Sequence, residues 1–294
     1  MSAEAFCAPG LRADTQRQPT LDDHLREWGL RHVPFAATTD KSIPLFPVAA
    51  HRKIRQLLDT TAALRGVMAL TGDPGTGKST LIKNWMAALE PKRFLPLLLT
   101  QSSLSGTGVL ETLLAKLGEP VGFKRSTNLL RLEKHLSGLE PITLVLILDD
   151  AQNYPGPALE EIRLLLGLGA GARSTLALIL LGDAYLLGSL RLSVQRALFS
   201  RISASAQLPA LRPEDIPAYL SWHISRAGSE AEVFAPAAAD LLAQASEGNP
   251  RTLNLLARAS WLAAAFEKQF TIQPQHVHTA LDQVPAAKAK IHPA

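Results

Sequence analysis

The chain is poor in cysteine, in aromatic residues and in long apolar runs. Cys7 is the single cysteine among 294 residues, which excludes a disulfide framework within the chain and favours a reducing compartment. No Cys/His cluster has zinc spacing, and no apolar run approaches the roughly 20 residues of a membrane helix. No basic segment followed by an apolar one marks a signal peptide at the N-terminus. We therefore expect a cytoplasmic protein without a membrane partner.

The remaining composition is that of a folded, mildly basic protein. Hydrophobic residues make up 47% of the chain and charged residues 19%, so a substantial core is expected and wholesale disorder is not. The net charge of +4 permits nucleic-acid binding without requiring it.

The organisation of the chain changes near residue 209. Before it, strand-sized apolar runs alternate with helical patterns, which is typical of a parallel sheet covered on both faces. After it the sequence is helical and alanine-rich. We predict an α/β fold, a three-layer parallel sheet followed by a C-terminal helical domain. The expected parts are a flexible tail (1–20), an α/β domain (21–208), the helical domain (209–285) and a second tail (286–294). One continuous helix is expected over 186–201, and a closing strand over 203–208.

A glycine-rich segment carries the strongest functional signal. It fits the phosphate-binding pattern G-x-x-x-x-G-K-[ST] between an apolar strand and an amphipathic helix. Glycines let backbone N–H groups surround a phosphate at the helix N-terminus. Lys78 can reach the β- and γ-phosphates, and the Ser79 hydroxyl can bind Mg²⁺. The alternative is a strand-to-helix turn that binds nothing. The predicted ATP-binding residues are Gly72, Asp73, Pro74, Gly75, Thr76, Gly77, Lys78, Ser79 and Thr80.

A second signal lies some 70 positions downstream. The apolar run 144–148 ends in Asp149 and Asp150, as a Walker B strand does. Asp149 would hold Mg²⁺, and Asp150 could polarise the attacking water. Alternatively, the two aspartates cap the following helix.

These motifs together resemble those of AAA+ ATPases, and most closely the ExeA-type group. The resemblance rests on the phosphate loop, on Asp-Asp-Ala-Gln-Asn (149–153), on Gly-Asn-Pro-Arg (248–251) and on the segment 28–35. It covers roughly residues 25 to 285. It implies a three-layer P-loop NTPase sheet with a C-terminal helical lid, in which residues 21–208 would be the ATPase domain and residues 209–285 the lid.

The resemblance implies further roles. Asp183 would sense the γ-phosphate, and Arg251 would be a second sensor on the lid. Arg201, or else Arg196, would be an arginine finger lent by a neighbouring subunit. His51 lies where family members contact the base. Each of these residues could instead be purely structural.

One departure from the family concerns hydrolysis. The family usually carries glutamate where this chain has Asp150, which is shorter by one methylene. A displacement of about 1 Å can cost on the order of a hundredfold in rate. We therefore expect an ATPase whose hydrolysis is slow.

The resemblance also suggests what ATP is for. The chain is similar to TnsC- and MuB-type regulators of DNA transposition, which would assemble with ATP on duplex DNA as a ring or helical filament. Its partners would then be a transposase and a targeting adaptor. Basic residues in expected loops could grip phosphates without reading bases, or could form an ordinary solvated face. They are Lys92, Arg93, Lys116, Lys124 and Arg125.

Two other functions stay open. One is a secretion-pathway ATPase of the ExeA type. Such proteins carry a membrane span and a peptidoglycan-binding region, whereas this sequence ends at Ala294 with neither, so we expect the transposition role. The other is a nucleotide-dependent scaffold that scarcely hydrolyses, which Asp150 suggests.

Overall fold

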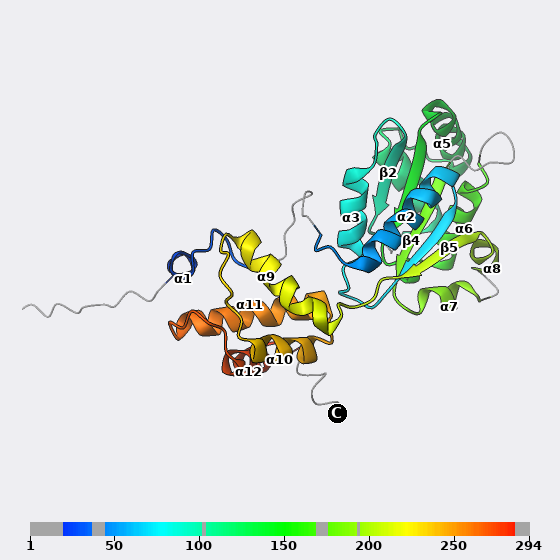
Figure 1. Cartoon of the computed structure of the whole chain (residues 1–294). Helices are drawn as coiled ribbons and strands as arrows, with labels where there is room; N and C mark the ends of the chain where they lie inside the picture. The colour runs from blue at the N-terminus through cyan, green and yellow to red at the C-terminus, as the bar shows by residue number, and fades with distance from the viewer. Residues whose placement is uncertain (1–19, 37–44, 102–103, 169–175, 193–194, 286–294) are drawn as a thin grey trace, which may run out of the picture.

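The structure is a computed structural model that describes residues 20–36, 45–101, 104–168, 176–192 and 195–285. A β-sheet flanked by helices forms one part of it, and a cluster of helices forms the other (Figure 1). The predicted tails, apart from Thr20, lie outside the described residues.

The sheet has five strands in the order β2-β3-β4-β1-β5, and every neighbouring pair is parallel. The central strands are buried throughout, because their apolar residues face helices on both sides. Edge strand β2 contains Pro96, which lacks the N–H that a central position requires. The predicted α/β fold and the closing strand are confirmed. The strands are β1 (Val67–Thr71), β2 (Phe94–Leu99), β3 (Thr143–Leu148), β4 (Leu176–Gly182) and β5 (Ile202–Gln207).

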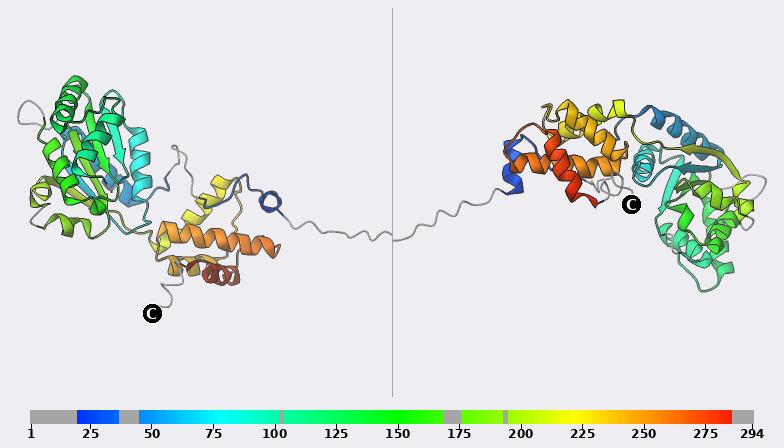
Figure 2. Two further views of the ribbon diagram at one scale, coloured as in Figure 1. Left: turned by 180° about the vertical axis from the view of Figure 1, so that it is seen from behind. Right: turned by 90° about the horizontal axis from the view of Figure 1, so that it is seen from below.

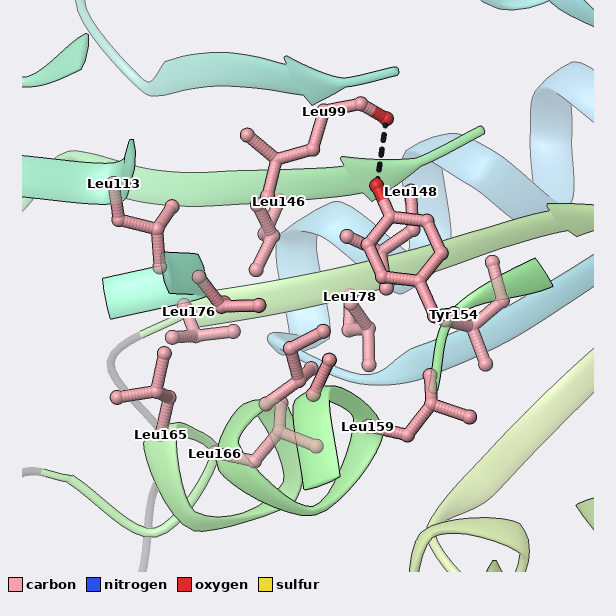
Figure 3. Packing of buried hydrophobic residues seen from close by; sticks show 14 of the residues in the cluster. Leu99, Leu113, Leu146, Leu148, Tyr154, Leu159, Leu165, Leu166, Leu176 and Leu178 are labelled. Atoms are coloured by element: carbon pink, nitrogen blue, oxygen red, sulfur yellow. Dashed lines mark hydrogen bonds between the residues drawn. The ribbon is translucent and has the colours of Figure 1, made fainter. Parts of the chain in front are cut away.

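Helices α4 (Gly106–Lys116), α5 (Arg125–Leu139) and α6 (Gly156–Leu165) cover one face of the sheet. Leu144, Leu146 and Leu148 point into this layer, because alternate residues of a strand face the same side. Figure 3 shows this packing, in which the Tyr154 hydroxyl donates a hydrogen bond to the Leu99 carbonyl at 3.3 Å. The bond fixes the chain just beyond β3, where predicted site residues lie.

The opposite face is covered by α2 (Ala49–Leu64) and α3 (Lys78–Ala88). Val145 and Ile147, the alternate residues of β3, pack into this second layer. Both helices therefore rest on the strands that lead into the predicted site.

The C-terminal part is helical, as predicted. Its helices are the 3-10 turn η3 (Pro213–Asp215), α9 (Ile216–Ala227), α10 (Pro236–Ser246), α11 (Pro250–Phe266) and α12 (Pro274–Gln283). Proline begins several of them, where its missing N–H costs no hydrogen bond. Among the described residues, no helix is both long and apolar enough to cross a membrane.

The N-terminal segment packs with this helical part. Helix α1 (Leu21–Glu27) lies beside the C-terminal helices in Figures 1 and 2. Trp28, Leu30 and Phe35 are buried in the same core as the lid helices, and the Trp28 and Trp261 rings lie 6.2 Å apart. The two cores are therefore not divided at one point of the sequence, although the prediction grouped residue 21 onward with the α/β domain. The domain boundaries themselves stay a prediction.

The continuous helix expected over 186–201 is wrong. Two short helices, α7 (Leu186–Leu190) and α8 (Arg196–Phe199), stand in its place. Leu190 is buried, but the next leucine, Leu192, is 64% exposed. The apolar stripe that would hold one helix against the sheet is thus interrupted.

Candidate nucleotide-binding site

The predicted phosphate loop lies at the carboxyl end of the sheet, between β1 and α3. Gly75 and Gly77 have φ angles of 94° and 98°, a left-handed conformation that side chains disfavour. Gly77 is the N-cap of α3, so the loop ends at a helix N-terminus, where N–H groups are available to an anion. The local geometry fits a bound phosphate.

Lys78 is held inside this loop. Its Nζ donates hydrogen bonds to the carbonyl oxygens of Gly72, at 2.7 Å, and Asp73, at 3.1 Å. Burial lowers the pKa of Lys78, and the nearby carboxylates, Asp150 foremost, oppose that shift. Lys78 is 8% exposed, and its ammonium group interacts with several acidic side chains.

Ser79 connects the loop to the end of β3. Its hydroxyl donates a hydrogen bond to Asp149 Oδ2 at 2.8 Å. A hydroxyl and a carboxylate are hard oxygen ligands that suit Mg²⁺. Within the described ranges, no group of three or more His, Cys, Asp or Glu side chains is placed to hold a metal ion. Mg²⁺ here would take its other ligands from phosphate and water, as it commonly does.

Asp150 follows in a left-handed conformation, with φ 51°. Its N–H donates to Asp149 Oδ1 at 3.1 Å, and the Gln152 amide approaches its Oδ1 at 3.5 Å. The Gln152 carbonyl oxygen in turn accepts the Asp183 N–H at 3.3 Å. Gln152 thereby bridges the ends of β3 and β4, a role that the sequence prediction missed although it quoted the motif.

Gly182 makes room for this bridge. A Cβ at this position would lie 2.8 Å from Gln152 Oε1 and 2.6 Å from Leu186 Cδ2. Asp183 itself accepts a hydrogen bond from the Tyr185 N–H at 2.9 Å, which caps the turn after β4. The Asp183 carboxylate is thus used in the turn, and the side-chain amide that lies next to the end of β4 is that of Gln152.

The helical part contacts the phosphate loop directly. Asn249 Nδ2 donates to the Pro74 carbonyl at 2.8 Å, and the Arg251 N–H donates to the Gly75 carbonyl at 3.2 Å. The Asn249 Oδ1 also caps α11. Sequence reasoning singled out Arg251, whose side chain is exposed, and missed the contact that Asn249 makes.

His51 lies in the first turn of α2. Burial, with Arg55 as a smaller cause, lowers the pKa of its imidazole. Among the described residues, its Nδ1 is buried without a hydrogen-bond partner. The ring is therefore held as a neutral group.

Arg196 and Arg201 are exposed and lie away from this site. Arg201 immediately precedes β5, which begins at Ile202. Since β5 runs parallel to β1, Arg201 lies at the amino end of the sheet. Six residues of strand span about 20 Å, so Arg201 does not reach the loop of its own chain.

The predicted DNA-contact residues also avoid the phosphate loop. Lys92 and Arg93 precede β2, and therefore lie at the amino end of the sheet. Lys116 ends α4, and Lys124 precedes α5. These four are exposed, whereas Arg125 donates hydrogen bonds to both carboxylate oxygens of the buried Glu161 at 2.9 to 3.1 Å.

Comparisons with known proteins agree with this arrangement. Residues 62–190 match the family model described as AAA domain. The fold is similar to that of CDC6P from Pyrobaculum aerophilum, with TM-score 0.64 and 19% identity, covering 88% of this chain and 71% of that one. It is also similar to Drosophila ORC bound to DNA, with TM-score 0.63 and 16% identity, covering 99% and 73%. The fold is that of P-loop AAA+ ATPases, as predicted.

The sequence is also similar to that of one curated protein. The chain is 28% identical, over 247 residues, to the general secretion pathway protein A of Aeromonas hydrophila. The alignment covers 81% of this chain and 44% of that protein, so the chain spans less than half of its relative's length. The chain is thus similar to AAA-domain proteins over residues 62–190 and to this secretion-pathway protein over 247 residues.

Proposed function

We propose that this chain is an ATP-dependent AAA+ protein that oligomerises on duplex DNA and regulates DNA transposition by recruiting a transposase to its target. The observation that carries the nucleotide part is the 2.8 Å hydrogen bond between Ser79 and Asp149. It joins the phosphate loop to the acidic end of β3, the pairing on which Mg²⁺-dependent phosphoryl transfer depends.

The phosphate loop, Gly72 to Thr80, would bind the triphosphate through its N–H groups. Lys78 would exchange its two carbonyl acceptors for β- and γ-phosphate oxygens. Ser79 and Asp149 would hold Mg²⁺, which when bound neutralises charge on those phosphates. His51, kept neutral by burial, would accept a hydrogen bond from the base.

Asp150 would orient the attacking water. Gln152 supports this role, because its amide approaches Asp150 Oδ1 while its carbonyl is anchored on β4. A weakly hydrolysing scaffold is the corresponding alternative. Replacing Asp150 with Glu should raise turnover if the short side chain limits the rate, and unchanged phosphate release from Asp150→Glu would leave the scaffold as the better account.

A neighbouring subunit would complete the site. Arg201, or Arg196 in its place, is exposed and lies at the far end of the sheet from its own phosphate loop, so it would act on the triphosphate of the next copy. Arg251 would respond from the lid, because its N–H already contacts Gly75. Asp183 caps a turn close to the Lys78 ammonium and would sense nucleotide through Gln152.

Duplex DNA is the proposed cargo. The net charge is +4, and Lys92, Arg93, Lys116 and Lys124 are exposed. One structure of similar fold is that of Drosophila ORC bound to DNA, which supports the proposal at the level of fold only. Arg125 contributes less, since Glu161 already engages its guanidinium.

The test measures ATP-dependent binding to duplex DNA and assembly on DNA in one preparation of the protein. ATP and Mg²⁺ should promote binding to a fluorescent duplex at low salt, and electron microscopy with a non-hydrolysable analogue should show rings or filaments on DNA. Co-purification with a transposase that requires ATP would support the final step. Absence of an ATP-dependent shift would remove the DNA part while leaving the ATPase intact.

A secretion-pathway ATPase is the second candidate, and the curated relative favours it. In that case duplex DNA should neither bind in an ATP-dependent manner nor stimulate phosphate release. Recovery of the protein with components of the cell envelope, in an amount that depends on Lys78, would then replace DNA binding as its signature.

A further inference from the structure

The turn between α4 and α5 presents a fully exposed aromatic ring. Phe123 is 111% exposed, the highest value among the large apolar residues of the described ranges. Val121, in the same turn, is also exposed. Aromatic side chains dominate the energetics of interfaces, so the exposed ring is a candidate for contact with another molecule.

The turn is fixed from beneath. The Asn128 side chain, 2% exposed, accepts the Gly122 N–H at 2.7 Å and donates to the Gly122 carbonyl at 2.9 Å. Arg131 donates to the Pro120 carbonyl at 2.9 Å. The backbone on the N-terminal side of Phe123 is thus held on both polar groups of Gly122, and the ring is presented without the freedom of an ordinary surface loop.

The charges around the tip are unequal. Glu119 is paired with His135 at 2.7 Å, and Glu161 is paired with Arg125 at 2.9 Å. Lys124 directly follows Phe123 and is exposed, and the exposed Lys116 is the last residue of α4. The nearby carboxylates are therefore engaged, whereas Lys124 next to the aromatic tip is exposed.

We propose that Phe123 is an apolar wedge that enters a base step of duplex DNA, while Lys124 and Lys116 contact the flanking phosphates. This inference rests on the proposed DNA-binding function. Side chains such as Phe insert between base steps and bend the duplex, and flanking cations supply the sequence-independent attraction. An apolar protein pocket would not need the lysines, and a rigid turn reduces the ordering cost of insertion.

Three substitutions test the wedge in the full chain. Phe123→Ala should weaken binding to a duplex by roughly tenfold, a typical loss for one base-stacking contact, and should leave the salt dependence unchanged. Lys124→Ala should instead lower the salt slope by about 1. Leu64→Ala is the matched control, because Leu64 is an exposed leucine of α2 and lies outside the turn between α4 and α5; the affinity of this variant for the duplex should equal that of the unmodified protein.

Two further readouts separate stacking from general contact. In a duplex with a dye at each end, the distance between the two dyes should decrease when the unmodified protein binds and bends the DNA. With Phe123→Ala the distance should stay that of a straight duplex. Phe123→Trp should show fluorescence quenching on duplex DNA that Leu64→Trp lacks. Of the four tryptophans, Trp28, Trp85 and Trp261 are buried and Trp222 is half-buried, so the signal of the unmodified protein with DNA is subtracted as the background.

Bending, quenching and reduced affinity together support the wedge. A protein that binds duplex DNA equally well with Phe123→Ala, without bending or quenching, overturns the wedge and leaves the proposed function standing. Loss of oligomers with Phe123→Ala in the absence of DNA assigns the tip to a second copy and also overturns it. No duplex binding by the unmodified protein removes both.

Discussion

The two ends of the same parallel sheet are built differently. At the carboxyl end the charged and polar groups are bonded to one another, as in Lys78 with loop carbonyls and Ser79 with Asp149. At the amino end Arg201 and Lys92 are exposed. The difference agrees with the proposal that the first end is a pre-organised small-molecule site, while the second end offers groups for contact with other molecules.

Among the variants that test the difference between the two ends, Lys78→Ala should have the largest effect. Nucleotide binding should fall below detection in a fluorescent-nucleotide titration, because the loop loses the cation that reaches two phosphates. Lys92→Ala, at the other end, is the control and should bind nucleotide normally. Retained ATP affinity in Lys78→Ala would count against the carboxyl end as the nucleotide site.

Arg201→Ala should reduce ATP hydrolysis by on the order of a thousandfold, the range of an absent arginine finger, while nucleotide affinity changes little. Mixing it with Lys78→Ala should restore part of the activity, since a Lys78→Ala subunit still lends its Arg201. Arg196→Ala is the comparison variant with a smaller expected loss. Failure of the mixture to recover would argue against action between subunits.

The buried Lys78 should also give nucleotide binding a pH dependence. Burial lowers its pKa, so the charged form that attracts phosphate is lost at a lower pH than for an exposed lysine. ATP affinity should decline as pH rises through that lowered pKa, by up to about tenfold per pH unit. Isothermal titration at rising pH measures this, and a decline in affinity that begins no earlier than for an exposed lysine would contradict a burial-lowered pKa.

Asn249→Ser separates the lid contact from helix capping. Serine can still cap α11, but its hydroxyl lies one bond nearer the backbone than the Asn249 amide nitrogen and should not reach the Pro74 carbonyl. Loss of one hydrogen bond of about 1 kcal/mol should weaken ATP binding roughly fivefold with little change in melting temperature. A matching loss of thermal stability would instead assign Asn249 to the helix alone.

The smallest effect concerns salt. Lys124→Ala should lower the slope of log affinity for DNA against log salt by about 1. Lys53→Ala, on the exposed side of α2, is the control and should leave the slope unchanged. Equal changes in both variants would contradict a phosphate contact that is particular to Lys124.

Much of this arrangement follows from local sequence patterns. The apolar run before Asp149 and the glycine spacing before Lys78 each specify an element and its end within about ten residues, so the strands and the phosphate loop are predictable. The phosphate loop and Asp149 meet at one edge because the carboxyl ends of parallel strands lie at the same edge of the sheet.

The remaining features depend on contacts between distant segments. Asn249 and Pro74 are 175 positions apart, and no periodicity relates them. The Gln152 bridge needs the β3–β4 pairing, and the burial of Trp28 against Trp261 needs the lid to be in place. The interruption between α7 and α8 depends on which leucines the sheet covers, which the spacing of leucines alone does not reveal.

The most direct test of the account is the fluorescence anisotropy of a labelled duplex titrated with the protein at low salt, with and without ATP and Mg²⁺. We predict that the protein binds the duplex tightly with ATP and weakly without it, and that ATP has no effect on duplex binding by Lys78→Ala. Duplex binding that is absent, or that is equal in all three cases, would contradict it.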